Sequence, residues 1–502
     1  MVRKRRKHII AFLAALALVA AACSDGGEST DTSGESTNTT AAGSTTAATA
    51  APGGGVTVRW SVIAGFYTDW AEQVAAEWEA ETGNNLEVVG IDFPVLYENQ
   101  VLESVGDTGA YDILTYDVGW KAEFAESGYL LQLDDLLAGA GSAAEGLSDV
   151  HPALLETTSK WRGGTYGLPY YTFTMGMFYR CDLWEDPSEQ ADFEAEFGYP
   201  LAVPRTYEEM ADMADFFTRA PGDTLKGEAV ADNFYGIGLM AGRFPHVQDE
   251  INSIAWTNGA KVINDDGTPG VTDPGFIDAV DLYVNRLLPS APPGAGTSAF
   301  NEVVGQMQSG LISMTSAFYL DQYPNMIQTE ELIPGARICT APSPGGHTWV
   351  GAFGLGISPD SENAEAALSF LSFLFSSDSQ QAFATGGGST TVTSILSDDA
   401  LVAANPLTTG HFPTLLQVLD HTADSNFYPN YLFVPQGGKI YDEMTTWYSS
   451  AAAGEETPQG AMAKMAEAIE RQCGGVCEIA NDALGEGYSP TPAAFPYDQY
   501  GY

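Results

Sequence analysis

The chain has 502 residues and a formal net charge of −46, from 66 acidic residues and 20 Lys or Arg residues. So large a negative charge excludes nucleic acid and anionic membrane surfaces as favoured partners. About 450 residues (502 less the first 55) follow a low-complexity N-terminal region, and one hydrophobic core rarely supports so many, so we expect two lobes.

The N-terminus carries the features of a secretory signal. Basic residues at positions 3–7 precede an apolar run over residues 9–22, which is too short to span a bilayer comfortably. Small residues lead into Cys23, as in the bacterial lipoprotein signal, in which the cysteine is lipidated and begins the mature chain. A plain signal peptide with a chance cysteine is the alternative. We expect residues 1–22 to be a lipoprotein signal peptide and Cys23 to hold the protein on the outer face of a bacterial cell membrane.

Residues 23–55 are expected to form a disordered tether. Of the 32 residues from 24 to 55, 26 are Ser, Thr, Gly or Ala, and none has a large apolar side chain. Such a segment cannot bury enough surface to fold.

Four cysteines remain after Cys23, namely Cys181, Cys339, Cys473 and Cys477. An even number in an exported chain predicts disulfides, for which three pairings exist. Glycines between Cys473 and Cys477 make a local bridge sterically feasible, so we favour this pair together with Cys181–Cys339. A metal site at Cys473 and Cys477 is the weaker interpretation, because no histidine lies near them in sequence.

The first part of the folded chain alternates between strand and helix patterns. Apolar residues at 56, 58, 60 and 62 predict a strand, and Trp70, Val74 and Trp78 share one face of a helix that Gly83 ends. Strands over 86–91 and 111–116 flank a helical stretch over 97–105. This rhythm predicts an α/β fold with a largely parallel sheet, in which ligands bind beyond the carboxyl ends of the strands. Asp117 and Trp120 stand at such an end.

Residues 161–183 form the stretch around which the chain is organised. A turn at Gly163 and Gly164 leads into a run rich in aromatic and β-branched residues, with Pro169 near its start. We interpret this run as an extended crossing from one folded unit into another, and an ordinary core strand is the alternative. Strand alternation sends Tyr170 and Tyr171 to opposite faces, and we expect Tyr171 to point into a cleft.

Several segments, in order, resemble the extracellular solute-binding proteins of ABC importers, in the carbohydrate-binding family 1 that is similar to maltose-binding protein. No segment carries chemistry alone, but their order and spacing over about 400 residues are specific. They are YDILTYDVGW (111–120), FAESGYLLQLDDLL (124–137), GTYGLP (164–169), MFYRCDLWEDP (177–187), FGYPLAVPRTYEEM (197–210), AWTNGA (255–260), MQSGLISM (307–314) and GAFGLGIS (351–358).

The resemblance implies a two-lobed periplasmic-binding-protein-like fold with a hinge and a ligand cleft between the lobes. The N-terminal lobe would comprise residues 56–170 and 355–425, and the C-terminal lobe residues 171–354 and 426–480. Residues 481–502 form a Pro/Tyr-rich tail to which we assign no role and which could be disordered.

A sugar site needs aromatic rings for the apolar face of the sugar and carboxylates or amides for its hydroxyl groups. Predicted loops and strand ends, together with the family pattern, supply the candidates. For the two Trp residues core packing is the alternative, and for Asp117 a helix cap. The predicted ligand-binding residues are Tyr67, Asp117, Trp120, Tyr171, Trp256, Tyr319, Phe353 and Tyr428.

We therefore expect a monomeric binding component that captures a sugar or oligosaccharide and delivers it to an ABC permease, without cofactor or metal. Motifs of metalloproteases, serine hydrolases and phosphate-binding loops are absent from the sequence, and the protein is not expected to be an enzyme. One alternative is a binding protein for a cation such as a polyamine, suggested by the acidity. A cell-surface glycoside hydrolase ranks lower, because 66 acidic residues always offer some pair of carboxylates.

Overall fold

The structure is a computed structural model that describes residues 55–138, 142–480 and 487–502. The predicted signal peptide, Cys23 and the tether up to residue 54 lie outside the described residues. Within them, no helix combines the length and the apolar character needed to cross a membrane.

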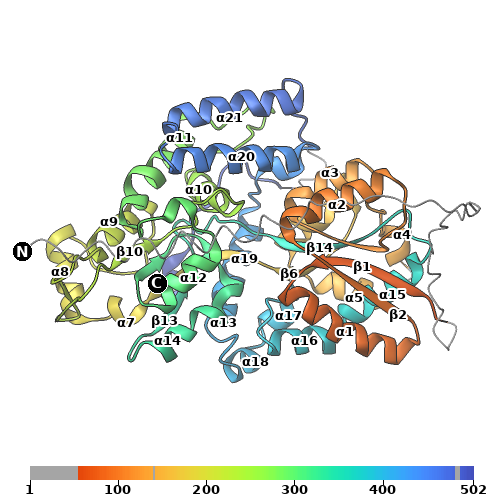
Figure 1. Cartoon of the computed structure of the whole chain (residues 1–502), viewed down its shortest axis with the longest axis horizontal. Helices are drawn as coiled ribbons and strands as arrows, with labels where there is room; N and C mark the ends of the chain where they lie inside the picture. Colours follow the sequence, from red (N-terminus) through yellow and green to blue (C-terminus); the bar gives the residue numbers. More distant parts are fainter. Residues whose placement is uncertain (1–54, 139–141, 481–486) are drawn as a thin grey trace, which may run out of the picture. The chain divides into compact units, whose positions relative to one another are not determined.

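Two five-stranded sheets form the framework (Figure 1). In the first sheet the order is β2–β1–β3–β14–β6. β1, β2 and β3 are parallel, and β14 runs antiparallel to both β3 and β6, so four of the five strands point the same way, as predicted. Its strands are β1 (Thr57–Ile63), β2 (Asn85–Ile91), β3 (Ile113–Tyr116), β6 (Leu168–Thr172) and β14 (Ala352–Ile357).

The second sheet is centred on β7, which pairs antiparallel with β11, β12 and β13, while β10 is parallel to β11. Its strands are β7 (Met175–Arg180), β10 (Tyr235–Gly238), β11 (Ile312–Thr315), β12 (Phe318–Tyr319) and β13 (Ile338–Ala341).

Amphipathic helices cover both sheets. In Figure 1 α1 lies beside α15 near the first sheet, and α20 lies beside α21 with α10 below. The helices of eight or more residues are α1 (Phe66–Thr82), α2 (Phe93–Val105), α5 (Ser142–Asp149), α8 (Pro187–Phe197), α9 (Tyr207–Phe217), α10 (His246–Thr257), α11 (Pro274–Leu282), α12 (Phe300–Gln308), α15 (Ala364–Leu374), α16 (Ser377–Thr385), α19 (Phe412–Ser425), α20 (Gly437–Ala452) and α21 (Pro458–Cys473).

The stretch 161–183 passes from one sheet to the other. Its tight turn has Gly163 at φ 77°, a conformation that glycine adopts without strain. The chain then leaves the first sheet at the end of β6 and enters the second at the start of β7, with two residues between the strands. A second passage joins β13 of the second sheet to β14 of the first. This stretch is therefore the crossing that the sequence indicates.

Two disulfides join Cys181 to Cys339 and Cys473 to Cys477, which is the pairing favoured from the sequence. The first links the end of β7 to β13 beside it in the second sheet. The second closes the turn that follows α21.

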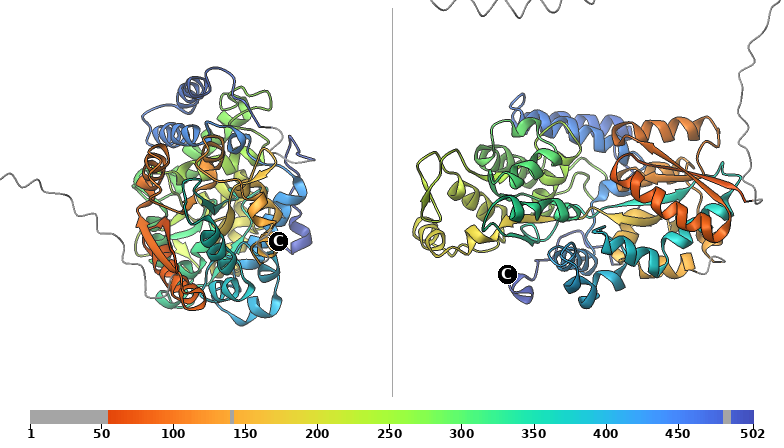
Figure 2. Two further views of the ribbon diagram at one scale, coloured as in Figure 1. Left: turned by 90° about the vertical axis from the view of Figure 1, so that its right-hand side faces the viewer. Right: turned by 60° about the horizontal axis from the view of Figure 1, so that its bottom comes forward.

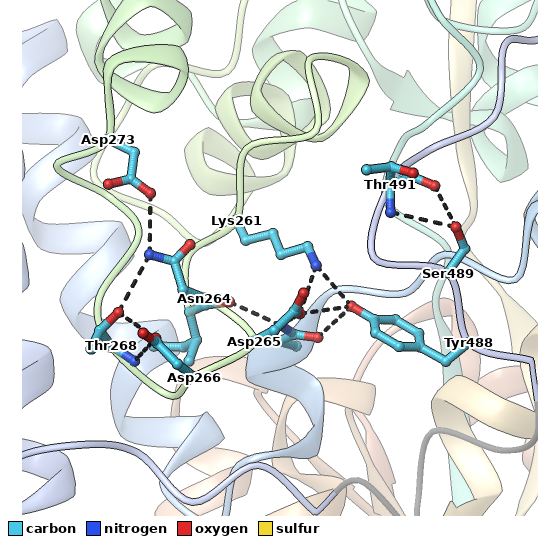
Figure 3. Close-up of polar contacts among 11 residues, drawn as sticks. Lys261, Asn264, Asp265, Asp266, Thr268, Asp273, Tyr488, Ser489 and Thr491 are labelled. Carbon is cyan, nitrogen blue, oxygen red and sulfur yellow. Dashed lines mark hydrogen bonds and ion pairs between the residues drawn. The ribbon is translucent and has the colours of Figure 1, made fainter.

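The end of the Pro/Tyr-rich tail, residues 487–502, is packed on the folded body. Tyr488 lies in a polar cluster with Lys261, Asp265 and Asn430, and its hydroxyl donates to Asn430 Oδ1 at 2.7 Å (Figure 3). Farther along, the imidazole of His347 lies 2.8 Å from the carbonyl oxygen of Ala493.

The last residues of the chain lie beside α19 (Figure 2), where the hydroxyl of Tyr502 donates to Gln417 Oε1 at 3.0 Å. Phe495 is buried against His421 of the same helix and against Gly346. The tail therefore joins α19 to the segment between β13 and β14.

Replacing Phe495 with alanine is expected to lower the free energy of unfolding by about 2 kcal/mol, because a buried aromatic ring is lost at the edge of the core. Chemical denaturation measures this change, with Gln499→Ala, an exposed residue of the same tail, as the control. An unchanged midpoint for Phe495→Ala would show that the tail contributes nothing to stability.

Candidate ligand-binding site

A cavity of about 490 Å³ lies between the strand ends of the first sheet and the helices of the second. This volume is within the range of about 300–1,000 Å³ typical of small-molecule sites. On the side of the first sheet, the cavity is lined by the loops and the first helical residues that follow β1, β2 and β3. Ligands bind at this end of the strands in parallel sheets. The residues that line it are Ile63, Ala64, Tyr67, Asp92, Phe93, Asp117, Phe173, Phe244, Pro245, His246, Asp249, Phe300, Tyr319, Asp321, Gln322, Phe353 and Tyr441.

Aromatic rings form one wall of the cavity. The ring of Tyr67 lies edge-on to Phe353 at 5.7 Å and to Tyr171 at 5.1 Å, measured between centroids. Phe173, in the crossing between β6 and β7, lies 4.5 Å from Phe353. Such a wall offers an apolar surface to the C–H face of a ligand.

Asp117 follows β3 directly and caps the short helix after it. Its Oδ1 accepts a hydrogen bond from the backbone N–H of Gly119 at 2.8 Å, and the side chain also lines the cavity. Burial raises the pKa of Asp117 to about 7, although the bond from Gly119 opposes this shift. Asp117 therefore caps the helix, as one of its two predicted roles requires, and also lines the cavity.

A second carboxylate, Asp249 of α10, is held by a chain of polar side chains. The hydroxyl of Tyr319 donates to Asp249 Oδ2 at 2.5 Å, and His246 Nδ1 lies 2.9 Å from the same hydroxyl. Burial raises the pKa of Asp249 well above its usual value, and the nearby charge of Asp117 adds to the rise. Burial also lowers the pKa of His246 to about 4, so this imidazole is neutral at physiological pH.

A third carboxylate, Asp321, lies just after β12. The hydroxyl of Tyr171 donates to Asp321 Oδ2, as does Gln322 Nε2 at 3.0 Å. Burial raises the pKa of Asp321 to about 6 against these two hydrogen bonds, which lower it. Both side-chain donors are on Oδ2, and among the described residues Oδ1 has no hydrogen-bond partner.

Of the predicted ligand-binding residues, Tyr67, Asp117, Tyr319 and Phe353 line the cavity. Tyr171 packs against the rings of Tyr67 and Phe353, and its hydroxyl donates to Asp321, which lines the cavity. Its neighbour Tyr170 points the other way, against Trp60 and Trp70 in the core, as strand alternation predicts.

The other three predicted residues are not among the described residues that line this cavity, namely Trp120, Trp256 and Tyr428. Trp120 stacks on Phe93 at 5.5 Å and supports that ring from behind. Trp256 stacks on Trp349 and Tyr431, and together with Tyr428 it borders a separate void of about 20 Å³. These positions are those of packed core residues.

Sequence reasoning did not find Asp249, Asp321, His246 or Tyr441. The first three lie on α10 or just after β12, where no turn or motif marks them as exposed to a ligand. Tyr441 lies on α20, about 190 residues after Asp249 in sequence, and packs near Gly119. In the described part of the chain, no three His, Cys, Asp or Glu side chains are arranged to hold a metal ion.

Comparison with known proteins gives consistent matches. A family model for bacterial extracellular solute-binding proteins matches residues 65–381. A Brucella abortus protein named as a binding protein is 26% identical over 328 residues, which are 63% of this chain and 71% of that protein. The mannitol-binding protein of Pseudomonas aeruginosa is 23% identical over 302 residues, 57% of this chain and 61% of its own.

Among solved structures, an ABC transporter solute-binding protein from Agrobacterium radiobacter in complex with ribitol has the same fold. Its TM-score is 0.67 at 22% identity, over 83% of this chain and 98% of that one. The two-lobed α/β architecture expected from the sequence is thereby confirmed.

Proposed function

Because the chain belongs to the family of bacterial extracellular solute-binding proteins, we propose that it is the substrate-binding component of an ABC importer. We propose that it captures a sugar or a sugar alcohol in the cavity between the two sheets and delivers it to a membrane permease. The observation that carries this proposal is the cavity, which combines an aromatic wall with three buried carboxylates drawn from both sides. The names of the relatives support it, since one binds mannitol and another holds ribitol.

Closure of the two lobes would follow from this arrangement. Ligand contacts made to both lobes at once favour the closed state by their differential affinity. We place the lobe boundaries near those expected from the sequence, with hinge crossings at residues 173–174 and 342–351 and a third near residue 426, between α19 and α20. The permease would recognise the closed form.

We further propose that the protein acts as a monomer, tethered to the outer face of the membrane by lipid on Cys23, and that it has no enzymatic activity. Both its family and its structural neighbour are binding proteins. A glycoside hydrolase would release reducing ends from oligosaccharides, and detecting such release would contradict this part of the proposal.

A panel of sugars and sugar alcohols, including mannitol, ribitol and short oligosaccharides, is expected to contain at least one compound that raises the melting temperature. A ligand that binds only the folded state adds about 2.7 kcal/mol at about 100 times its Kd. Differential scanning fluorimetry of the mature protein measures the shift. If no compound shifts the transition at millimolar concentration, the carbohydrate assignment fails.

A further inference from the structure

The cavity is lined by acidic groups without basic partners. Four aspartates line it, and of the described lining residues none is Lys or Arg. His246 is neutral because its burial lowers its pKa to about 4. Arg243, next to the lining residue Phe244 in sequence, directs its guanidinium to Thr446. The four carboxylates are therefore not neutralised from within the lining.

Two of these carboxylates each present a buried oxygen without a protein donor. Asp249 is 1% exposed and Asp321 is 8% exposed, yet Oδ1 of each has no hydrogen-bond partner among the described residues. Tyr319 holds Oδ2 of Asp249, and Tyr171 and Gln322 hold Oδ2 of Asp321. A buried acceptor without a donor is unfavourable, so a ligand that donates a hydrogen bond to either carboxylate would stabilise the site.

Asp117 and Asp249 come from opposite sides of the cavity and are close enough for their charges to interact. Asp117 follows β3 of the first sheet, whereas Asp249 lies on α10, and the charge of Asp117 raises the pKa of Asp249. Glu250, behind Asp249, has the same effect. Burial and the charges of this pair raise the pKa of three nearby phenols, which carry no positive charge themselves, namely Tyr319, Tyr431 and Tyr441. Two carboxylates that line one cavity and repel each other favour either a proton or a cation between them.

We propose that the ligand of this cavity is an amino sugar or an amino-deoxy sugar alcohol, bound with its protonated amine between Asp117 and Asp249. This inference rests on the proposed function and narrows the class of sugar. The free oxygen of Asp321 then accepts from a ligand hydroxyl, and the rings of Tyr67, Phe173 and Phe353 cover the apolar face. An ammonium group donates up to three hydrogen bonds, which suits a site made of acceptors. Sugar phosphates and uronic acids are disfavoured, because they would add negative charge to a lining that has no Lys or Arg among its described residues.

Proton uptake and release follow from this arrangement. Burial raises the pKa of Asp117 to about 7 and that of Asp321 to about 6, so at pH 6–7 both carboxyls are partly protonated without ligand. A cation beside them favours the ionised form, and binding is therefore expected to release protons. A neutral sugar has no such effect.

Isothermal titration calorimetry with matched compounds tests the proposal. The first set is D-glucosamine, D-glucose and N-acetyl-D-glucosamine, and the second is 1-amino-1-deoxy-D-sorbitol and D-sorbitol. Chitosan and chitin oligosaccharides extend the comparison to longer ligands. In at least one set the amine is expected to bind at least tenfold more tightly than its hydroxyl or acetylated counterpart, and to release protons in buffers of different ionisation enthalpy.

Asp249→Asn should abolish this preference for the amine, whereas Glu467→Gln, an exposed position on α21, should leave it unchanged. If neutral sugars bind as tightly as the amines, this inference is wrong and the proposed function stands. If polyamines such as putrescine bind and neither amino sugars nor neutral sugars do, both this inference and the proposed function are wrong.

Discussion

Replacing Asp117 with asparagine is expected to stabilise the unliganded protein above pH 7 while weakening its affinity for ligand. The amide oxygen of asparagine can still accept the hydrogen bond from Gly119, so the helix cap survives. What is lost is a buried charge whose burial raises the pKa of Asp117 from 3.8 to about 7.

The sign of the pH dependence follows from this rise. In the parent protein, the folded state binds the proton of Asp117 more tightly than the unfolded state does. The stabilisation from this proton is fully present below pH 4 and is lost as the pH rises through about 7. An asparagine at this position does not titrate and makes no such contribution. The gain in the free energy of unfolding from Asp117→Asn should therefore grow between pH 4 and pH 7, to at most about 4 kcal/mol at about 1.4 kcal/mol per pKa unit.

Denaturant titrations of both proteins at pH 5 and pH 8 measure this difference. Asp265→Asn is the matched control, because Lys261 and Asn430 hold the pKa of Asp265 below its usual value despite partial burial, which raises it (Figure 3). That substitution should destabilise the protein at pH 8. An Asp117→Asn variant that is less stable than the parent at pH 8 would show that Asp117 is a structural group and not one reserved for a ligand.

Replacing Tyr171 with alanine is expected to weaken ligand binding by at least a hundredfold. The substitution removes a ring that packs on Tyr67 and Phe353 and also the hydroxyl that orients Asp321. A hydrogen bond to a charged group contributes about 1.5–3 kcal/mol, so Tyr171→Phe alone should weaken binding about ten- to hundredfold.

Tyr170→Phe is the control for Tyr171→Phe, because each substitution removes one hydroxyl from neighbouring residues of β6. Tyr170 packs on Trp60 and Trp70, away from the cavity, and its loss of a hydroxyl should leave the Kd unchanged. Calorimetry with the best ligand of the panel measures all three variants. Equal losses for Tyr170→Phe and Tyr171→Phe would contradict the placement of the cavity.

The framework of the fold follows from local sequence patterns. Alternating apolar residues predicted β1, and helical spacing with Gly83 at its end predicted α1, which the structure confirms. The insertion of β14 between β3 and β6 could not be predicted from such patterns, because β14 begins more than 230 residues after β3 ends. Long-range pairing depends on the packing of the whole lobe.

Cavity residues that follow the ends of strands could be predicted from the sequence, whereas those inside helices could not. Asp117 could be found because it follows a strand of a parallel sheet, where ligands bind. Asp249 lies inside α10, and only tertiary packing brings it into the lining of the same cavity as Asp117. Conversely, Trp256 matched a family pattern, but its indole packs in a cluster with the buried rings of Trp349 and Tyr431. Aromatic residues are large enough to be buried in either role, so their presence in a sequence does not distinguish the two.

The most direct test of the account is a crystal structure of the protein with the compound that stabilises it most. The account predicts electron density for the ligand in the cavity, in contact with Asp117, Asp249 and Asp321 and stacked against Tyr67 or Phe353. A ligand bound elsewhere, for example in the hollow beside Trp70 and Phe383 between α1 and α16, would contradict it.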